Sequence, residues 1–448
     1  MRVHGRVANT VRDFFVGAAI ALWGRVGHAV GVAGTTTTTT DRGWRAVLAE
    51  AGPLLAGLRR LDAGDHGNTR LHLADAVTVL LAAFFDTAVR SQRLVEQFSA
   101  HAAPALGLGV PVVRRSTLSD ALRRFDPAEL APLIRALVPR AVARGGPIDA
   151  DLAGVTRRLV AADGSYFNLA GEATWALLNR RGRTDARQYR VRLNLQLDVT
   201  HLLPVDADVS GADDAGEPAA FARRIAPDAV YVVDRNFVHF GFVRAVLGAG
   251  SSLVLRLKRT TGFAVGESRE LTAADRGRGV LRDEVGRLSG PTSPGNQGRR
   301  SRTARPPDAT LRRVTVWDPA NRCEVTLLTD LLDVDAHVVG TIYRLRWHVE
   351  LFLRWLKVHA ACAHLLSKSA RGVTLQFYVA IVGTLLMHLR AGRVGKYELA
   401  WMRWVAAGQM RLADVPALAD RVGRERARDR ARRRGQTQGG LAAKKNAR

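Results

Sequence analysis

The chain has 448 residues, of which 47% are hydrophobic and 24% charged, a profile typical of a soluble globular protein with two or three domains. Its 67 lysines and arginines exceed its 41 acids by 26, which favours nucleic acid as a partner over an anionic membrane or a merely solvated basic surface. The two cysteines, Cys323 and Cys362, have no metal-type spacing, which argues against a zinc site or a disulfide framework and predicts reduced core thiols.

Residues 1–70 are interpreted as an N-terminal extension with a linker. Residues 14–23 are apolar and follow several arginines, as in a signal peptide, but Arg25 follows at once and no small-residue cleavage site is present. We therefore expect an amphipathic or buried helix there and no membrane role. Residues 33–43, with their run of threonines, are the expected linker.

Residues 71–150 have the pattern of a helical domain. Residues 74–91 predict one helix, and residues 113–125 predict another with Ser116 or Thr117 as its N-cap. A basic helical region ahead of a catalytic core is typical of DNA binding, and the alternative is a plain packing role. We interpret this region as a helical DNA-binding domain.

Residues 151–259 change to a pattern of strands and helices, the first part of a catalytic domain. Residues 191–199 alternate between apolar and polar types, as in a half-buried strand, and residues 229–237 form an apolar run containing an acid. The expected order is three strands, helix, strand, helix and strand, at residues 157–165, 191–199, 202–210, 218–225, 229–237, 240–247 and 251–259.

Residues 260–334 are interpreted as a β-rich insertion. Residues 288–308 are rich in glycine, proline, serine and arginine, whereas residues 311–318 and 323–331 flank a turn and predict a hairpin.

Two further segments follow. Residues 335–395 are the second part of the catalytic domain, and residues 373–389 within it predict a buried core helix, being too interrupted for a membrane span. Residues 396–448 are a C-terminal helical segment and an arginine-rich tail suited to non-specific phosphate contact.

The segment YRLRWHVELFLRWLK, residues 343–357, is mostly apolar yet carries charges. At about 100° per residue, four polar residues would share one helical stripe roughly 60° wide and about 21 Å long: Tyr343, Arg346, Glu350 and Lys357. One interpretation is a salt-bridged polar edge of little energetic value. The other is a row of donors for a phosphodiester chain beside an acid that holds a metal.

Two further acids end predicted strands. Asp163 ends the first strand in VAADGSYF, and Asp234 ends the fourth in VYVVDRNF. Singly, Asp163 could be a turn residue and Asp234 a helix N-cap. Together with Glu350 they supply the several carboxylates that two divalent ions roughly 3.5–4 Å apart require. Other acids near the proposed core stay open as alternatives: Asp198, Asp206, Asp208, Asp333 and Asp335.

The Y-x2-R-x3-E-x6-K spacing over residues 343–357 resembles the Y-R-E-K signature of bacterial DDE transposases of the insertion sequence 4 family. The segments RSTLSDAL, DGSYF, DRNF and LLTDLL are similar to family segments in the same order, and the resemblance covers roughly residues 70–390. It implies an α/β fold with a ribonuclease-H-like catalytic core, a mixed five-stranded sheet with flanking helices. The β-rich insertion would interrupt this core, and the helical N-terminal domain would precede it.

The resemblance implies an enzyme in which Asp163, Asp234 and Glu350 bind two Mg2+ ions, for which Mn2+ could substitute. One ion would activate the attacking water or 3′-hydroxyl, and the other would stabilise the departing 3′-oxygen. Members of the family nick the element's end to free a 3′-hydroxyl. They then join this hydroxyl to target DNA by transesterification, without a covalent protein intermediate.

The resemblance also implies DNA contacts. Tyr343, Arg346 and Lys357 would contact phosphates at the element's end, and Trp317 would stack on a flipped base unless it is a core residue of the insertion. A homodimer would act on the terminal inverted repeats and the target DNA, in the bacterial cytoplasm at the nucleoid. The alternatives are a catalytically inactive, domesticated DNA-binding repressor and a ribonuclease-H-like nuclease without strand transfer.

Overall fold

The computed structural model describes residues 41–432, except for residues 63–66, 68, 87, 144–151, 153, 181–186, 215, 290–305, 361, 363, 427 and 430–431. The helix expected at residues 14–23, most of the threonine-rich linker and most of the arginine-rich tail lie outside the described residues. Where only an extension was expected, the chain forms α3 (Gly43–Leu48), η1 (Ala49–Ala51) and α4 (Gly52–Asp62). Helix α4 packs on α5 (Leu73–Phe85), so this segment belongs to the fold.

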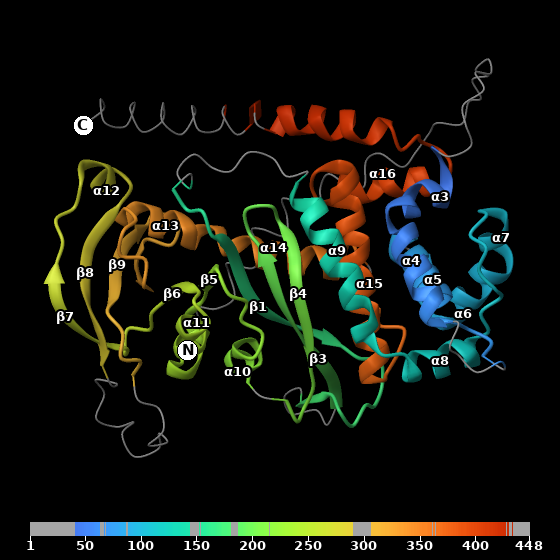
Figure 1. Ribbon diagram of the computed structural model, residues 1–448, viewed down its shortest axis with the longest axis horizontal. Helices are drawn as coiled ribbons and strands as arrows, with labels where there is room; N and C mark the ends of the chain where they lie inside the picture. Colours follow the sequence, from blue (N-terminus) through green and yellow to red (C-terminus); the bar gives the residue numbers. More distant parts are fainter. Residues whose placement is uncertain are drawn as a thin grey trace. The chain divides into compact units, whose positions relative to one another are not determined.

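The helices of the N-terminal region gather around one long apolar helix, α15 (Ala370–Ala391). Helices α5, α8 (Arg115–Arg124) and α9 (Ala131–Val142) contact it, as does strand β4 (Leu203–Ser210) (Figure 1). Among the described residues it alone is long and apolar enough to cross a membrane, but 83% of its apolar window is buried in protein. The predicted core helix at this position is confirmed.

The short helices that link these elements complete the region. They are α6 (Gln92–Gln97), η2 (Phe98–Ala102), α7 (Ala103–Ala105) and η3 (Pro127–Leu130), with α16 (Lys396–Ala406) packed on α3 and α5. The predicted N-cap at Ser116 or Thr117 was wrong. Helix α8 already includes both residues, and its N-cap is Arg114, whose side chain makes no capping hydrogen bond.

Strand β1 (Arg158–Asn168) lies inside a mixed sheet. It pairs antiparallel with β3 (Arg187–Asp198) and parallel with β5 (Ala229–Val233), and β5 pairs parallel with β6 (Ser252–Arg256). All five strands predicted for the catalytic core are present, including β4 beside β3. The short β2 (Leu177–Arg180), which also pairs with β3, was not predicted.

The sheet has ten strands, so the expectation of a five-stranded sheet was wrong. Its order is β2-β3-β1-β5-β6-β10-β9-β8-β7, with β4 also paired to β3 (Figure 1). The insertion supplies β7 (Gly262–Ser268), β8 (Val280–Ser289), β9 (Leu311–Asp318) and β10 (Cys323–Thr329), with α12 (Ala273–Gly277) between β7 and β8. The predicted hairpin is β9–β10, and β10 pairs with β6. Without this pairing β6 would present an unpaired edge, and the insertion satisfies its backbone groups.

The two faces of the sheet carry separate cores. Ala161 of β1 belongs to the core that includes α14 (Trp347–Val358). Its neighbour Ala162 belongs to the core beneath α10 (Glu217–Ala222) and α11 (Phe240–Gly248). Because side chains alternate along a strand, odd-numbered residues of β1 face α14 and even-numbered ones face α10.

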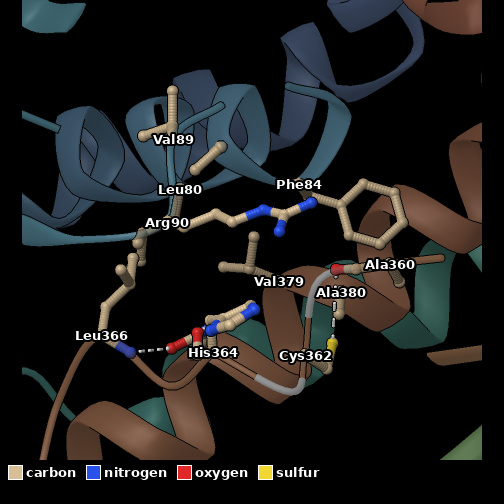
Figure 2. Close-up of a pocket in the computed structure, with 12 residues that line it drawn as sticks. Leu80, Phe84, Val89, Arg90, Ala360, Cys362, His364, Leu366, Val379 and Ala380 are labelled. Carbon is tan, nitrogen blue, oxygen red and sulfur yellow. Dashed lines mark hydrogen bonds between the residues drawn. The ribbon is translucent and has the colours of Figure 1, made fainter. Parts of the chain in front are cut away.

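Cys362 lines a small cavity of about 20 Å3 between α5 and α15 (Figure 2). Its thiol donates to the carbonyl oxygen of Ala360 at 3.7 Å, and burial raises the pKa of the thiol to about 12. Nearby, the Gln376 side chain accepts a hydrogen bond of 2.8 Å from the Leu366 N–H. The expected core thiol is confirmed for Cys362, whereas Cys323 on β10 is partly exposed.

Gly383 of α15 allows α5 to approach that helix closely. A Cβ atom at residue 383 would lie 2.5 Å from Cδ1 of the buried Phe84 ring. We expect Gly383→Ala to lower the free energy of unfolding by about 1–3 kcal/mol in urea denaturation, because the ring must shift. Gly248→Ala is the control, since a Cβ at the end of α11 meets open space. Equal losses in the two variants would contradict the packing argument.

Candidate active site

Asp163 and Asp234 lie level with each other on neighbouring parallel strands. Ala161 pairs with Val232 in the β1–β5 register, and each aspartate lies two residues further on. Residues 161 and 232 belong to the core on the α14 face, so both aspartates belong to that face, on strands roughly 4.8 Å apart. Asp234 follows β5 as predicted. The prediction that Asp163 ends its strand was wrong, because β1 continues to Asn168 in its pairing with β3.

The segment that carries the four-residue stripe is two helices rather than one. Helix α13 (Ala336–Leu345) ends just before Arg346, and α14 begins just after it. At the junction the Arg346 N–H bonds the Tyr343 carbonyl and the Val349 N–H bonds the Arg346 carbonyl, each three residues apart. Such tighter bonds interrupt an α-helix, so Tyr343 belongs to α13 and the stripe is not straight.

Glu350 reaches the same face of the sheet from α14, which packs on β1. Val349 and Leu353 of this helix are buried in the core, whereas Glu350 is half-buried. Arg346 Nη2 lies 2.7 Å from Glu350 Oε1, so the two form an ion pair. The salt-bridge interpretation of the stripe is therefore correct for this pair.

The acids near Asp163 affect its ionisation. The pKa of Asp163 is raised to about 7, mainly by burial and then by the nearby Glu217, Glu350 and Asp234 carboxylates, while Arg346 opposes this rise. Like charges held this close disfavour ionisation. A cation bound among these carboxylates would relieve that repulsion.

The donor set suits a hard divalent cation, because carboxylate oxygens are the ligands that Mg2+ prefers. As arranged, no three acids, histidines or cysteines among the described residues are close enough to hold one ion together. Each acid has an oxygen engaged: Asp163 Oδ1 accepts from the Gly164 N–H at 2.9 Å, and Asp234 Oδ1 from the Asn236 N–H at 2.7 Å. The N-cap interpretation of Asp234 is thus correct for η5 (Arg235–Phe237), whereas Asp163 is no turn residue.

Lys357 and Tyr343 border the acids. Lys357 Nζ lies 4.9 Å from the centre of the Phe167 ring, which shares the Asp163 face of β1. Burial lowers the pKa of Lys357, and the Asp163 charge opposes that change. The Arg346 guanidinium lies 5.6 Å from the centre of the Tyr343 ring. The structure therefore brings together all four residues of the stripe near the two aspartates.

The sequence matches the family model described as "Transposase DDE domain" over residues 154–386, more than half of the chain. The chain belongs to this family of DDE transposases. The matched region contains both aspartates, the insertion and the helices that carry Tyr343 and Glu350.

Two relatives agree with this assignment. A Sinorhizobium fredii (strain NBRC 101917 / NGR234) protein named "Putative transposase y4zB" is 28% identical over 300 residues, which cover 63% of this transposase and 78% of the relative. A Geobacillus stearothermophilus protein is named "Probable transposase for insertion sequence element IS5377". It is 28% identical over 75 residues, 17% of this transposase and 20% of that relative.

Trp317 of the transposase lies on β9, in the predicted hairpin, and 45% of it is exposed. A core role for this tryptophan is therefore wrong. Strands β6 and β10 separate β9 from β5, so Trp317 is at least roughly 14 Å from the aspartates. Val314 and Val316 belong to the core on the α14 face, so strand alternation places Trp317 on the opposite face. Another exposed tryptophan is Trp347, the first residue of α14, which the sequence analysis did not single out.

Three of the alternative acids of the transposase, Asp198, Asp206 and Asp208, have other partners. Asp206 on β4 accepts from Arg224 Nε at 2.6 Å, and Asp208 lies 4.0 Å from the same guanidinium. Asp198 is buried and pairs with His201 at 3.0 Å. Strand β3 separates β4 from β1, which removes Asp206 and Asp208 from the group around Asp163.

Glu217 is the acid that sequence reasoning missed. It is the first residue of α10, and in the sequence an acid before Pro218 indicates only the start of a helix. The other signal was Gly164, because glycine inside a strand often marks the close approach of another group. Glu217 Oε1 is buried beside Gly164 and has no hydrogen-bond partner.

Proposed function

We propose that this DDE transposase is of the insertion sequence 4 type, binds the terminal inverted repeats of an insertion sequence, and catalyses metal-dependent DNA cleavage and strand transfer. The observation that carries the proposal is the convergence of Asp163, Asp234 and Glu350 on one face of the sheet, beside Arg346 and Lys357. Crowded acids beside cationic side chains suit a metal-assisted reaction at a phosphodiester.

In this proposal Asp163, Asp234 and Glu350 hold two Mg2+ ions, with Mn2+ as a substitute. Bound cations would favour ionisation of a water or 3′-hydroxyl and offset the charge on the leaving 3′-oxygen. The protein holds the two aspartates in register through the pairing of β1 with β5. A cation bound by Glu350 would weaken its ion pair with Arg346 and make the guanidinium available to a phosphate.

Arg346, Lys357 and Tyr343 would hold the phosphates of the DNA end. A phosphate beside Lys357 would restore the charged form that burial disfavours. During transfer, the 3′-hydroxyl oxygen forms a bond to the target phosphorus as the bond from phosphorus to the target 3′-oxygen breaks. The proton of the hydroxyl leaves to solvent, and the number of phosphodiester bonds is unchanged.

The excess of 26 positive charges supports DNA as the partner. The exposed arginines of α8 and its N-cap, Arg114, Arg115, Arg123 and Arg124, support the helical region as a DNA-binding surface. Two ends must be cut together, which favours a homodimer on DNA, in the cytoplasm at the nucleoid.

The test is a duplex that carries the terminal repeat of the element encoding this chain, labelled at one 3′ end. We expect nicking at the repeat boundary with Mg2+ or Mn2+, none with EDTA, and joining of the freed end to a supercoiled target. Binding without nicking would overturn the proposed catalytic activity and favour a DNA-binding repressor. Nicking without joining would favour a nuclease.

The two exposed tryptophans can be separated by their effect on DNA affinity. Stacking on a base is worth about 1–3 kcal/mol, so we expect Trp347→Ala to weaken repeat binding by about tenfold. Trp317→Ala tests the role predicted from the sequence, and an unchanged Kd would assign stacking to Trp347 alone. Trp404→Ala is the control, since Trp404 is similarly exposed but on α16. A Trp347→Ala protein that binds as wild type does would contradict the expectation.

A further inference from the structure

Glu217 approaches Asp163 from behind the strand that carries it. Asp163 faces α14, whereas the even-numbered Gly164 faces α10, whose first residue is Glu217. A Cβ atom at residue 164 would lie 2.5 Å from Glu217 Oε1 and 3.1 Å from Arg192 Cδ. A side chain at this position would displace the Glu217 carboxylate from where it lies.

The two carboxylates meet at one backbone group. The Gly164 N–H donates to Asp163 Oδ1 at 2.9 Å. Burial raises the pKa of Glu217, while Arg192 and then the same Gly164 N–H act in the opposite direction. Glu217 is therefore within reach of the amide that Asp163 now occupies, and its Oε1 has no hydrogen-bond partner.

A buried polar network lies on the same face as Glu217 and carries a compensating charge. Arg192 is buried on the same face of β3, and its Nε donates to Asn194 Oδ1 at 2.8 Å. Asn194 Nδ2 in turn donates to Ser210 Oγ at 2.7 Å. An unpaired buried carboxylate would be costly, so the Arg192 charge makes the Glu217 position tenable.

We propose that Glu217 is a positioning residue of the catalytic centre, which takes the Gly164 N–H when Asp163 turns to a divalent cation and whose charge strengthens cation binding. The inference rests on the proposed function. Asp163 Oδ1 accepts from the Gly164 N–H, which holds the carboxylate toward the strand backbone. Glu217 supplies a second acceptor, so Asp163 can move away from the Gly164 N–H without leaving this buried donor unpaired.

The test is the affinity of the DNA-free protein for Mn2+ by isothermal titration calorimetry. We expect Glu217→Gln to weaken Mn2+ binding about tenfold, because a negative charge close to the site is lost. Glu217→Asp keeps the charge and should recover affinity to within about threefold of wild type. It also keeps the proposal testable if the glutamine variant does not fold, as judged by circular dichroism.

Glu398 supplies a matched control. It is buried on α16, pairs with Arg393 Nε at 2.5 Å, and has a buried Oε2 without a partner, but it lies outside the acid group. Glu398→Gln should leave Mn2+ affinity unchanged. If wild type nicks DNA and Glu217→Gln binds Mn2+ with wild-type affinity, the inference about Glu217 is overturned and the proposed function stands. If wild type neither binds Mn2+ nor nicks, the proposed function falls with it.

Discussion

Replacing Glu350 with glutamine is expected to slow nicking of the repeat end by about 10³-fold or more, with little change in repeat binding. The amide oxygen of the variant can still accept from Arg346, which lies 2.7 Å from Oε1 in the wild-type protein. The packing of α14 through Val349 and Leu353 is also untouched. The loss therefore reports the missing carboxylate, and single-turnover nicking with a parallel gel-shift assay measures it.

Glu324→Gln is the control for this substitution. Glu324 also pairs with an arginine, Arg282 Nη2 at 2.6 Å, but the pair lies exposed on the insertion. The Glu324→Gln protein should nick DNA at the wild-type rate, because exposed ion pairs contribute little to stability. Nicking by Glu350→Gln within tenfold of wild type would exclude Glu350 from the reaction.

Replacing Asp163 with asparagine is expected to abolish nicking and yet to stabilise the protein in EDTA at neutral pH. The pKa of Asp163 is about 7 in the fold against an ordinary value of 3.8, mainly through burial. The folded state therefore keeps a proton that the unfolded chain releases, so the contribution of Asp163 to stability is fully present below about pH 4 and is lost as pH rises through about 7. The full effect is up to about 4 kcal/mol, and asparagine removes it.

Melting temperatures in EDTA at pH 5 and pH 8 measure this effect. The pH-dependent fall attributable to Asp163 should be present in wild type and in Asp208→Asn, a strand aspartate that lies near Arg224 instead, and absent in Asp163→Asn. Added Mn2+ should raise the melting temperature of wild type at pH 8 but not that of Asp163→Asn. Equal pH dependence in wild type and Asp163→Asn would show that the pKa of Asp163 is not raised in the folded protein.

The strands of the core could be predicted because their patterns are local. Strand β5 is a continuous apolar run, and β3 alternates in type over most of its length. Strand β2 has only four residues, too few for a pattern. The pairing of β10 with β6 could not be predicted, because the pairing partner of an edge strand depends on contacts far apart in the sequence.

The candidate site was predictable in its residue types more than in its geometry. Asp163, Asp234 and Glu350 stand out as acids at the ends of apolar patterns or within them. The interruption at Arg346 carries no proline or glycine signal, so one continuous helix was the natural expectation. Glu217 approaches from the opposite face of β1, and strand periodicity gives no information about which distant side chain fills the space at a glycine.

The position of α15 has a consequence for where the DNA is cut. Helices α5, α8 and α9 pack on α15, and so does β4, so the described part of the region expected to recognise the repeat is packed on the same helix as the catalytic sheet. Recognised bases and the reacting phosphate would then be held at a constant separation. In a repeat lengthened by one base pair between them, the cut should stay at that separation from the recognised bases and no longer coincide with the element boundary.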